Sequence, residues 1–406
     1  MSVLTATPRI GDTRPGTTAP DDVVQMGGGY AFPDLLPDVS QIARNVASDF
    51  RTEALQYGPL FGLPDLRDAI VESVRADGVA CGRDNILVLN GAKQALDLLL
   101  RVMVRPGDPV IVSHPTYLTA LSIIRSHGAE LIEVDLDHDG MKVDTLAQML
   151  AARRSRGDSM PKLLFEVPDF HNPTGVTLSA ARRQRLVELA EEFGFFILED
   201  DPYRKLRFAG TGVPPIKSFD RSGRVIGAGT VSKIFAPGIR VGWANGDPDI
   251  IGRMAAAKSE GGCCPFTQRI VLEAMRTGLI DHHITELSEV MAAHLRAMCA
   301  SIDRHLPDAR YNVPNGGYFL WLELPADVSA AQVTLAASAS GAAIFSGDLF
   351  FGTVPAQGFV RLCFATSTPE RIDLGIRRIA EAIHRLRESP EKFVPGEATP
   401  LQRHTD

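Results

Sequence analysis

The chain carries at residues 232–243 the segment Ser232-Lys233-Ile234-Phe235-Ala236-Pro237-Gly238-Ile239-Arg240-Val241-Gly242-Trp243. Thr230 and Val231 precede it, and a Pro-Gly turn separates its lysine from its arginine. A lysine amine forms a Schiff base with an aldehyde. Hydroxyl and guanidinium groups hold a phosphate dianion. The segment therefore indicates an aldehyde cofactor that bears a phosphate, pyridoxal phosphate, and an amino acid as the substrate.

The composition fits this interpretation. A length of 406 residues predicts two or three domains of roughly 150 residues each. The apolar content of 45% and the charged content of 22% are ordinary for a soluble globular protein. The net charge of −7 argues against a nucleic-acid partner.

The cysteines and the N-terminus predict a location in the cytoplasm. The five cysteines are odd in number and match no metal-site spacing, so we predict free thiols and no metal. Residues 1–22 lack the apolar run of a signal peptide. No apolar stretch approaches the ~18 residues that span a bilayer, so no membrane partner is predicted.

The middle of the chain alternates between short apolar runs and helical periods. This alternation predicts an α/β fold with a mostly parallel central sheet that is flanked by helices. The expected strands are 86–89, 109–112, 130–134, 162–167, 195–199 and 224–229. The expected helices are 65–75, 92–104, 117–126 and 180–193. The basic cluster at 153–156 is interpreted as a solvated loop.

The pattern changes near residue 300, which predicts a second, smaller α+β domain. Its expected elements are a helix over 284–305, a strand within 317–322, a helix over 330–338, a strand over 359–364 and a helix over 369–386. The expected organisation is a disordered tail 1–24, a segment 25–62 packing with the small domain, a large cofactor-binding domain 63–300, the small domain 301–390 and a loose tail 391–406.

Polar motifs follow several of the expected strands. In open α/β sheets, ligands bind at the carboxyl ends of the strands. At Asn90-Gly91-Ala92-Lys93, the free amides of a helix start predict an anion site. Asp200, after the strand 195–199, can bond a pyridinium nitrogen, and Tyr203 can donate to the phenolate oxygen of the ring.

Three further residues complete the candidate set. Asn172, in His171-Asn172-Pro173-Thr174-Gly175, can bond the same ring oxygen, although this sequence is also an ordinary turn. Tyr117 can stack on a flat ring, with ordinary packing as the alternative. Arg361 is charged inside an apolar strand, so it needs a structural acid or an anionic ligand such as a substrate carboxylate.

Taken in this chain order, the motifs resemble the class I/II aminotransferases, a family of fold-type I pyridoxal-phosphate enzymes. The resemblance covers roughly residues 25 to 388. It rests on Tyr57-Gly58-Pro59, Asn172-Pro173-Thr174-Gly175, Asp200 with Tyr203, the segment 232–243 and Pro314-Asn315-Gly316-Gly317-Tyr318.

The resemblance implies a role for each matched residue. Lys233 is the Schiff-base lysine, and Arg361 binds the substrate carboxylate. The cofactor is held by Ala92, Lys93, Tyr117, Asn172, Asp200, Tyr203, Thr230, Ser232 and Arg240. Tyr57 reaches the phosphate of a neighbouring subunit, which implies a homodimer with shared active sites. Gly28, Gly29 and Tyr30 line the substrate side.

Two positions depart from the family pattern. Ala92-Lys93 stands where relatives often carry a small hydroxyl residue, so Thr230 and Ser232 are expected to do more of the phosphate binding. Ser346-Gly347 replaces a Pro-Gly pair near the substrate side, which weakens any inference about the substrate.

The implied activity moves the α-amino group of an amino acid to a 2-oxo acid through a Schiff base and a carbanion, as part of biosynthesis and amino-acid metabolism. The alternative is β- or γ-elimination, substitution or cyclisation, for example on S-adenosylmethionine, because the cofactor residues do not determine what becomes of the carbanion. Two other protein classes are not supported. A DNA-binding regulator would need a basic surface, whereas the net charge is −7. A dinucleotide-binding oxidoreductase would carry a Gly-x-Gly-x-x-Gly fingerprint after the first strands, and this sequence has none there.

Overall fold

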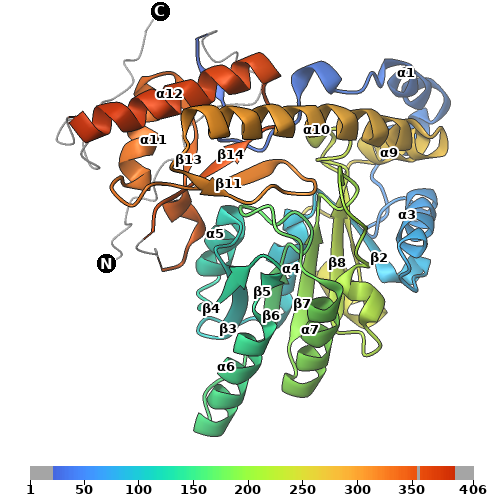
Figure 1. Ribbon diagram of the computed structural model, residues 1–406. Helices are drawn as coiled ribbons and strands as arrows, with labels where there is room; N and C mark the ends of the chain where they lie inside the picture. Colours follow the sequence, from blue (N-terminus) through green and yellow to red (C-terminus); the bar gives the residue numbers. More distant parts are fainter. Residues whose placement is uncertain (1–21, 354–356, 389–406) are drawn as a thin grey trace, which may run out of the picture.

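A computed structural model describes residues 22–353 and 357–388 of the chain. Figure 1 shows a large part built around a twisted sheet, a smaller part beside α12 (Pro369–Glu388), and the long helix α10 (Leu279–His305) running along both. The expected loose tail 391–406 lies outside the described residues. None of the described helices combines the length and the apolar character that a bilayer crossing requires.

An eight-stranded sheet, counted over the described residues, forms the centre of the large part. Its order is β2 (Ile86–Leu89), β9 (Gly242–Asn245), β8 (Val225–Thr230), β7 (Phe196–Asp201), β6 (Leu163–Glu166), β3 (Pro109–His114), β4 (Glu130–Asp137) and β5 (Gly140–Met141). The run from β8 to β4 is parallel, whereas β9, β2 and β5 pair antiparallel. Strands buried on both faces need apolar side chains at successive positions, which explains the continuous apolar runs.

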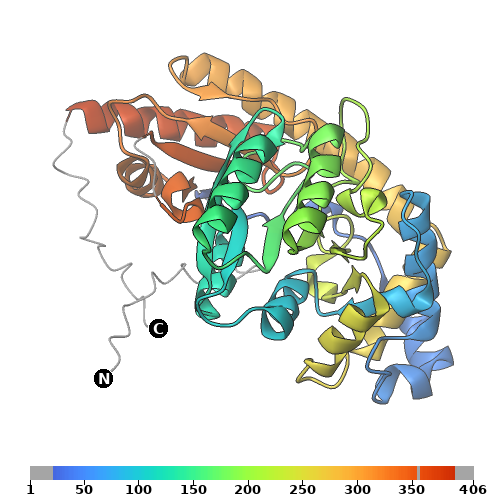
Figure 2. The same cartoon turned by 90° about the horizontal axis from the view of Figure 1, so that it is seen from below.

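Side chains of these strands alternate between two apolar cores. In β3, Val110 and Val112 face one core and Ile111 faces the other; in β7, Leu198 and Ile197 divide in the same way. The first core includes α4 (Lys93–Met103), α5 (Leu118–Ser126) and α8 (Pro248–Ala256). The second includes α6 (Val143–Arg156) and α7 (Ala180–Phe193), which lie on the opposite side of the sheet (Figure 2).

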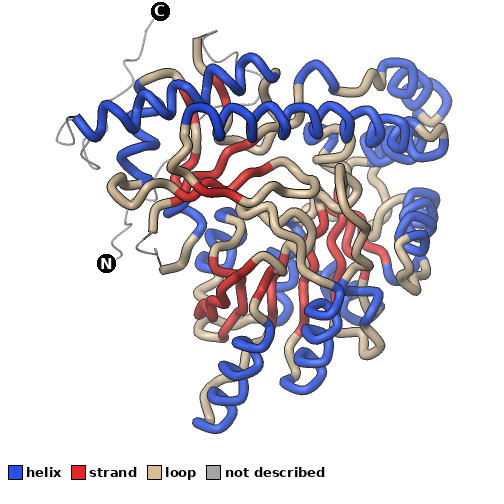
Figure 3. The backbone as a smooth tube through the Cα atoms, in the orientation of Figure 1, coloured by secondary structure: helices blue, strands red, loops and turns tan. Residues whose placement is uncertain are grey.

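The small part contains an antiparallel four-stranded sheet, separate from the central sheet in Figure 3. Its order is β10 (Arg310–Tyr311), β11 (Phe319–Glu323), β14 (Phe359–Cys363) and β13 (Phe345–Ser346). Helix α12 packs against α10 and α11 (Ala330–Ala339). Helix α10 also contacts α9 (Pro265–Arg276) of the large part. Since α10 spans Leu279–His305, the domain boundary expected at residue 300 falls inside one continuous helix.

The N-terminal segments differ from their expected organisation. Val24 is buried, and β1 (Val24–Gln25) pairs in parallel with β12 (Ala342–Ala343), so order begins before the expected tail boundary at residue 24. Residues 25–62, which we expected to pack with the small domain, divide between two partners. Helices α1 (Ser40–Asp49) and α2 (Arg51–Leu55) lie against α9 in the large part, because this is where their apolar side chains find a core.

The basic cluster at 153–156 lies in the last turn of helix α6, and our prediction of a loop there was wrong. Gly157 ends the helix with φ +72°, a left-handed conformation that glycine adopts without steric cost. Basic side chains in a last turn also interact favourably with the helix dipole. Basic residues followed by glycine are therefore a signal for a helix end, which the loop interpretation overlooked.

Candidate functional site

A cavity of about 160 Å³ lies at the carboxyl ends of the parallel strands. Ten of the predicted cofactor residues line it: Ala92, Lys93, Tyr117, Asn172, Asp200, Tyr203, Thr230, Ser232, Lys233 and Arg240. Gly91, Val167, Pro202 and Pro237 complete the lining. These residues come from five separate strand ends, so the sheet brings segments more than 140 positions apart to one place.

One wall of the cavity is rich in hydroxyl and guanidinium groups. The Ser232 amide donates to Thr230 Oγ1 at 3.1 Å, and Arg240 NH1 approaches Ser232 Oγ at 3.4 Å. The other terminal nitrogen of Arg240 donates to the carbonyl of Asn90 at 2.7 Å. Gly91 has φ +97°, and a Cβ there would stand 2.5 Å from the Arg240 guanidinium. Only glycine lets the guanidinium lie this close to the backbone.

Asp200 lies on the floor of this cavity at the end of β7, with only 7% of its surface exposed. Its Oδ1 is buried and has no hydrogen-bond partner within the described residues. Burial first, and then the neighbouring Asp201 carboxylate, raise the pKa of Asp200 to about 7. A buried carboxylate without a partner is costly, so the position is suited to a cationic N–H group supplied by a ligand.

Lys233 follows β8 and points its amine towards the N-terminal segment. Its Nζ donates to the carbonyl of Gly29 at 2.5 Å, and the Tyr318 hydroxyl donates to the Lys233 carbonyl at 2.7 Å. Burial lowers the pKa of the Lys233 ammonium to about 8, and the nearby Arg361 cation acts in the same direction. A substantial share of neutral amine is therefore present near pH 8, as a nucleophile or a base requires.

Arg361 projects from β14 of the small part towards the site, at 3% exposure. Its NH1 donates to Asn172 Oδ1 at 2.9 Å and its NH2 to the Gly27 carbonyl at 2.5 Å. Its buried Nε has no partner among the described residues. No carboxylate is among the described partners of its side chain, so the structural acid that we considered as an alternative is not found in the described chain.

Aromatic rings surround this guanidinium. Arg361 Cζ lies 4.0 Å from the ring centre of Phe319, 4.8 Å from that of Phe350 and 5.1 Å from that of Phe345. Cations over aromatic faces are attracted by the ring quadrupole, most strongly where water is excluded. The surrounding rings therefore hold the guanidinium in place, while its buried Nε has no hydrogen-bond partner among the described residues.

The remaining predicted residues lie outside the cavity lining. Gly28, Gly29 and Tyr30 belong to the segment after β1, where Gly29 meets Lys233 and a Cβ on Gly29 would stand 2.6 Å from the Phe319 ring. Tyr57 is 97% exposed and is not among the residues that line the cavity. The structure thus does not bring Tyr57 to the other candidates.

Sequence reasoning missed two supporting residues. Tyr318, fully buried, holds the backbone of Lys233, and its presence in the Gly316-Gly317-Tyr318 motif was the available signal. Arg183 is buried in α7 and pairs with Asp169 at 2.9 Å while donating to the carbonyls of Pro168 and Leu178. It thereby fastens the loop that presents Asn172. Nothing in the amphipathic pattern of α7 distinguishes this arginine from its exposed neighbours.

The cavity residues suit pyridoxal phosphate on three independent features. The unpartnered Asp200 Oδ1 matches a protonated ring nitrogen. The wall of Thr230, Ser232 and Arg240 around Gly91 matches a phosphate. The buried amine of Lys233 matches an aldehyde.

Comparison with known proteins agrees with this fit. The chain matches the family described as aminotransferase class I and II over residues 26–379. It belongs to that family. This pyridoxal-phosphate-dependent aminotransferase is 36% identical over 368 residues to aromatic-amino-acid aminotransferase 1 of Thermococcus litoralis, covering 89% of the chain and 88% of that relative.

Two solved structures are similar to this aminotransferase throughout. The multiple substrate aminotransferase from Thermococcus profundus has a TM-score of 0.86 at 36% identity and covers 91% of this chain and 93% of its own. The Pyrococcus horikoshii kynurenine aminotransferase, in complex with PMP, has a TM-score of 0.86 at 35% identity, with coverage of 90% and 92%. The predicted fold class is confirmed, and the alternative of an elimination, substitution or cyclisation enzyme is not favoured.

Proposed function

We propose that this aminotransferase takes its amino group from amino acids with aromatic side chains and passes it to a 2-oxo acid. The observation that carries the proposal is the surrounding of Arg361 by Phe319, Phe345 and Phe350. Phe319 and Phe350 are buried and Phe345 is partly exposed, and a planar apolar side chain gains contact area and favourable ring geometry beside Phe345. The name of the Thermococcus litoralis relative agrees with this substrate class.

The distribution of positive charge supports the same substrate class. Within the described chain, the basic residues that line the cavity are Lys93, Lys233 and Arg240; we assign the side chains of Lys233 and Arg240 to the cofactor, and the charge of Lys93 stabilises the Asp200 carboxylate. Arg361 then remains to bind one carboxylate, through the Nε that has no partner in the described part of the chain. A donor with a second carboxylate would bring an unpaired charge into an aromatic environment, which is costly.

We assign the cofactor contacts as follows. Thr230, Ser232, Arg240 and the backbone at Ala92 and Lys93 hold the phosphate. Asp200 pairs with the ring nitrogen, Asn172 and Tyr203 bond the ring oxygen, and Tyr117 lies against the ring. When bound, the cofactor supplies a covalent anchor for the substrate amine and an electron sink.

Within this arrangement Lys233 moves the proton. Its neutral Nζ accepts the Cα proton of the substrate, since burial lowers the pKa of this amine to about 8 and so gives a larger share of neutral amine than an exposed lysine has. Arg361 fixes the orientation of the substrate carboxylate, so that the Cα–H bond is presented to this amine. The ionised Asp200 holds the proton on the ring nitrogen, which favours the electron-accepting form of the ring.

The proposal includes a homodimer and a location in the cytoplasm. Tyr57 is exposed in one subunit, as expected for a residue that reaches the phosphate of a neighbouring subunit in a homodimer. The five cysteines are all free, which agrees with a reducing cytoplasm and with a role in amino-acid biosynthesis and metabolism there. Gly28, Gly29 and Tyr30 are assigned to the substrate entrance.

A panel of amino donors with one common 2-oxo acid tests the substrate class. We expect phenylalanine, tyrosine and tryptophan to exceed aspartate and 2-aminoadipate in kcat/KM by about 10²-fold or more, because a buried unpaired charge costs about 3 kcal/mol. Equal or higher values for the dicarboxylic donors would contradict the proposal. Glutamine and leucine, which are neutral, serve as controls for size and polarity.

Replacement of Arg361 by glutamine tests the carboxylate anchor. We expect Arg361→Gln to lower kcat/KM for both donor and acceptor by about 10²-fold, because the charge-assisted pair with the carboxylate is lost. The absorbance of the bound cofactor should change little. Arg361→Lys should recover only part of the loss, since an ammonium cannot reproduce the planar two-point contact. An equal loss for amine substrates without a carboxylate would contradict the assignment.

A further inference from the structure

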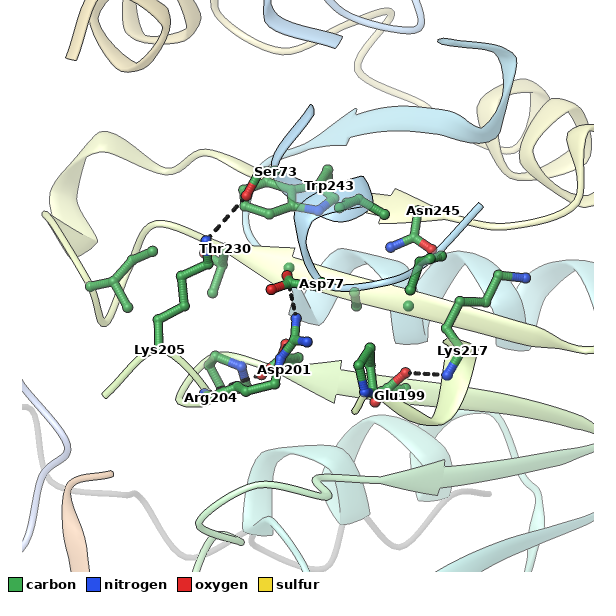
Figure 4. A pocket seen from close by; sticks show the side chains of 18 residues that line it. Ser73, Asp77, Glu199, Asp201, Arg204, Lys205, Lys217, Thr230, Trp243 and Asn245 are labelled. Carbon is green, nitrogen blue, oxygen red and sulfur yellow. Dashed lines mark hydrogen bonds and ion pairs between the residues drawn. The ribbon is translucent and has the colours of Figure 1, made fainter. Parts of the chain in front are cut away.

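A chain of ion pairs lies in a second pocket, which Asp77, Asp201 and Arg204 help to line (Figure 4). Arg204 Nε donates to Asp201 Oδ2 at 2.7 Å, and Arg204 NH2 donates to Asp77 Oδ2 at 2.8 Å. The Arg204 amide also approaches Asp201 Oδ1 at 3.2 Å. One guanidinium is therefore placed between two carboxylates that come from distant parts of the chain.

Strand β7 connects this ion-pair chain to the cavity. Asp200 and Asp201 are consecutive residues of β7, so their side chains leave the strand on opposite faces. Asp200 lines the cofactor cavity, and Asp201 lines the far pocket. No side-chain contact links the two carboxylates, and their influence on each other is electrostatic, across the thickness of one strand.

The charges that act on Asp200 come from several elements. Lys93 at the start of α4 and Lys233 after β8 favour its ionised form, and Asp201 opposes it. Tyr117 and Tyr203 line the same cavity, and the Asp200 charge acts on both. Burial raises the pKa of Asp200 to about 7. This value is close to neutral pH, so small changes in the surrounding charges alter the ionised fraction of Asp200.

We propose that Arg204 is a positioning residue that acts through its charge. It neutralises Asp201 on the far face of the sheet and thereby keeps Asp200 ionised to hold the cofactor ring. The inference rests on the proposed role of Asp200. Asp77 competes with Asp201 for the same guanidinium and limits the effect. The side chains of Asp201, Arg204 and Asp77 are 15%, 18% and 26% exposed, so solvent screens the interaction only in part.

The sign of the effect follows from linkage. Removal of the Arg204 charge leaves Asp201 uncompensated, which raises the pKa of Asp200 and reduces its ionised fraction near neutral pH. A ring nitrogen that carries a proton then binds less tightly. The pH below which the affinity for pyridoxal phosphate falls should move upward by about one unit, which is up to about tenfold in affinity at pH 6.5.

The test titrates the cofactor-free protein with pyridoxal phosphate between pH 6 and 9, following the cofactor spectrum. Arg204→Met is expected to lose about tenfold in affinity at pH 6.5 and much less at pH 9. Arg204→Lys should restore most of the affinity. Lys205→Met is the matched control, because Lys205 lines the same pocket but donates to Ser73 Oγ at 3.2 Å and not to Asp201. It should behave as the unmodified protein.

Two further arms separate charge from structural damage. A cofactor analogue with C–H in place of the ring nitrogen should show no loss of affinity in Arg204→Met. Asp201→Asn, which removes the opposing charge itself, should move the pH midpoint downward, in the direction opposite to Arg204→Met. If Arg204→Met does not fold, Asp77→Asn serves instead and should move the pH midpoint downward.

The proposal is overturned if Arg204→Met matches Lys205→Met, or if the analogue loses affinity equally. In either case, tight binding of pyridoxal phosphate by the unmodified protein would leave the proposed function standing.

Discussion

Lys233→Ala is expected to abolish transamination, with kcat falling by more than about 10⁴-fold, since loss of a base alone costs about 10²–10⁴-fold and the covalent anchor is lost with it. The structure supplies the physical reason. Lys233 lies in the cavity with its amine buried, and the pKa of this amine is lowered to about 8. Among the described residues, the other basic side chains of the cavity are those of Arg240, which lies at the wall that we assign to the phosphate, and Lys93, whose charge acts on Asp200.

Two measurements check this result. The absorbance band of lysine-bound pyridoxal phosphate should disappear in Lys233→Ala, and borohydride reduction of the unmodified protein should leave the cofactor mass on the peptide that contains Lys233. Lys258→Met is the matched control, because Lys258 is also a buried lysine but donates to the carbonyl of Val88 at 3.1 Å. It should keep the band. An active Lys233→Ala variant would refute the assignment.

Asp200→Asn is the second change with a large expected effect. We expect kcat to fall by about 10²–10³-fold, the range typical for loss of one preorganised electrostatic group. Asparagine keeps the shape of the side chain but removes the charge that holds the proton on the ring nitrogen. The cavity offers no replacement, since Oδ1 of Asp200 has no partner within the described chain.

Steady-state kinetics on Asp200→Asn and Asp201→Asn, measured side by side, isolate this effect. The two substitutions are chemically identical and adjacent, but the side chains lie on opposite faces of β7. Asp201→Asn should change kcat by less than about a tenth of the effect at Asp200. Equal losses for both variants would mean that the effect comes from general damage to the strand.

Much of the large part was predictable, because its strands are buried on both faces and read as continuous apolar runs. The strand expected at 195–199 is found as β7 (Phe196–Asp201), which runs two residues further and includes Asp200, and the helix expected at 92–104 is found as α4 (Lys93–Met103). Periodicity reports which side chains are buried but not which segments meet. Periodicity therefore could not predict that β9 lies between β2 and β8, or that α1 packs on α9.

The candidate site was likewise predictable only in part. Motifs at strand ends identified the cavity residues, since turn residues and isolated charges are visible in a sequence. The contacts that prepare them were not visible. Arg361 donates to Asn172 across 189 positions, and Arg204 joins Asp77 across 127. Only the folded chain brings such distant partners together.

The central claim is that this chain transfers an amino group and does not eliminate or cyclise. A single-turnover reaction tests it most directly: the cofactor-loaded enzyme is mixed with phenylalanine in the absence of any 2-oxo acid, and products are quantified by mass analysis. We predict one equivalent of phenylpyruvate per active site, no ammonia, and conversion of the cofactor to its amine form. Release of ammonia, or multiple turnovers without an acceptor, would contradict the claim.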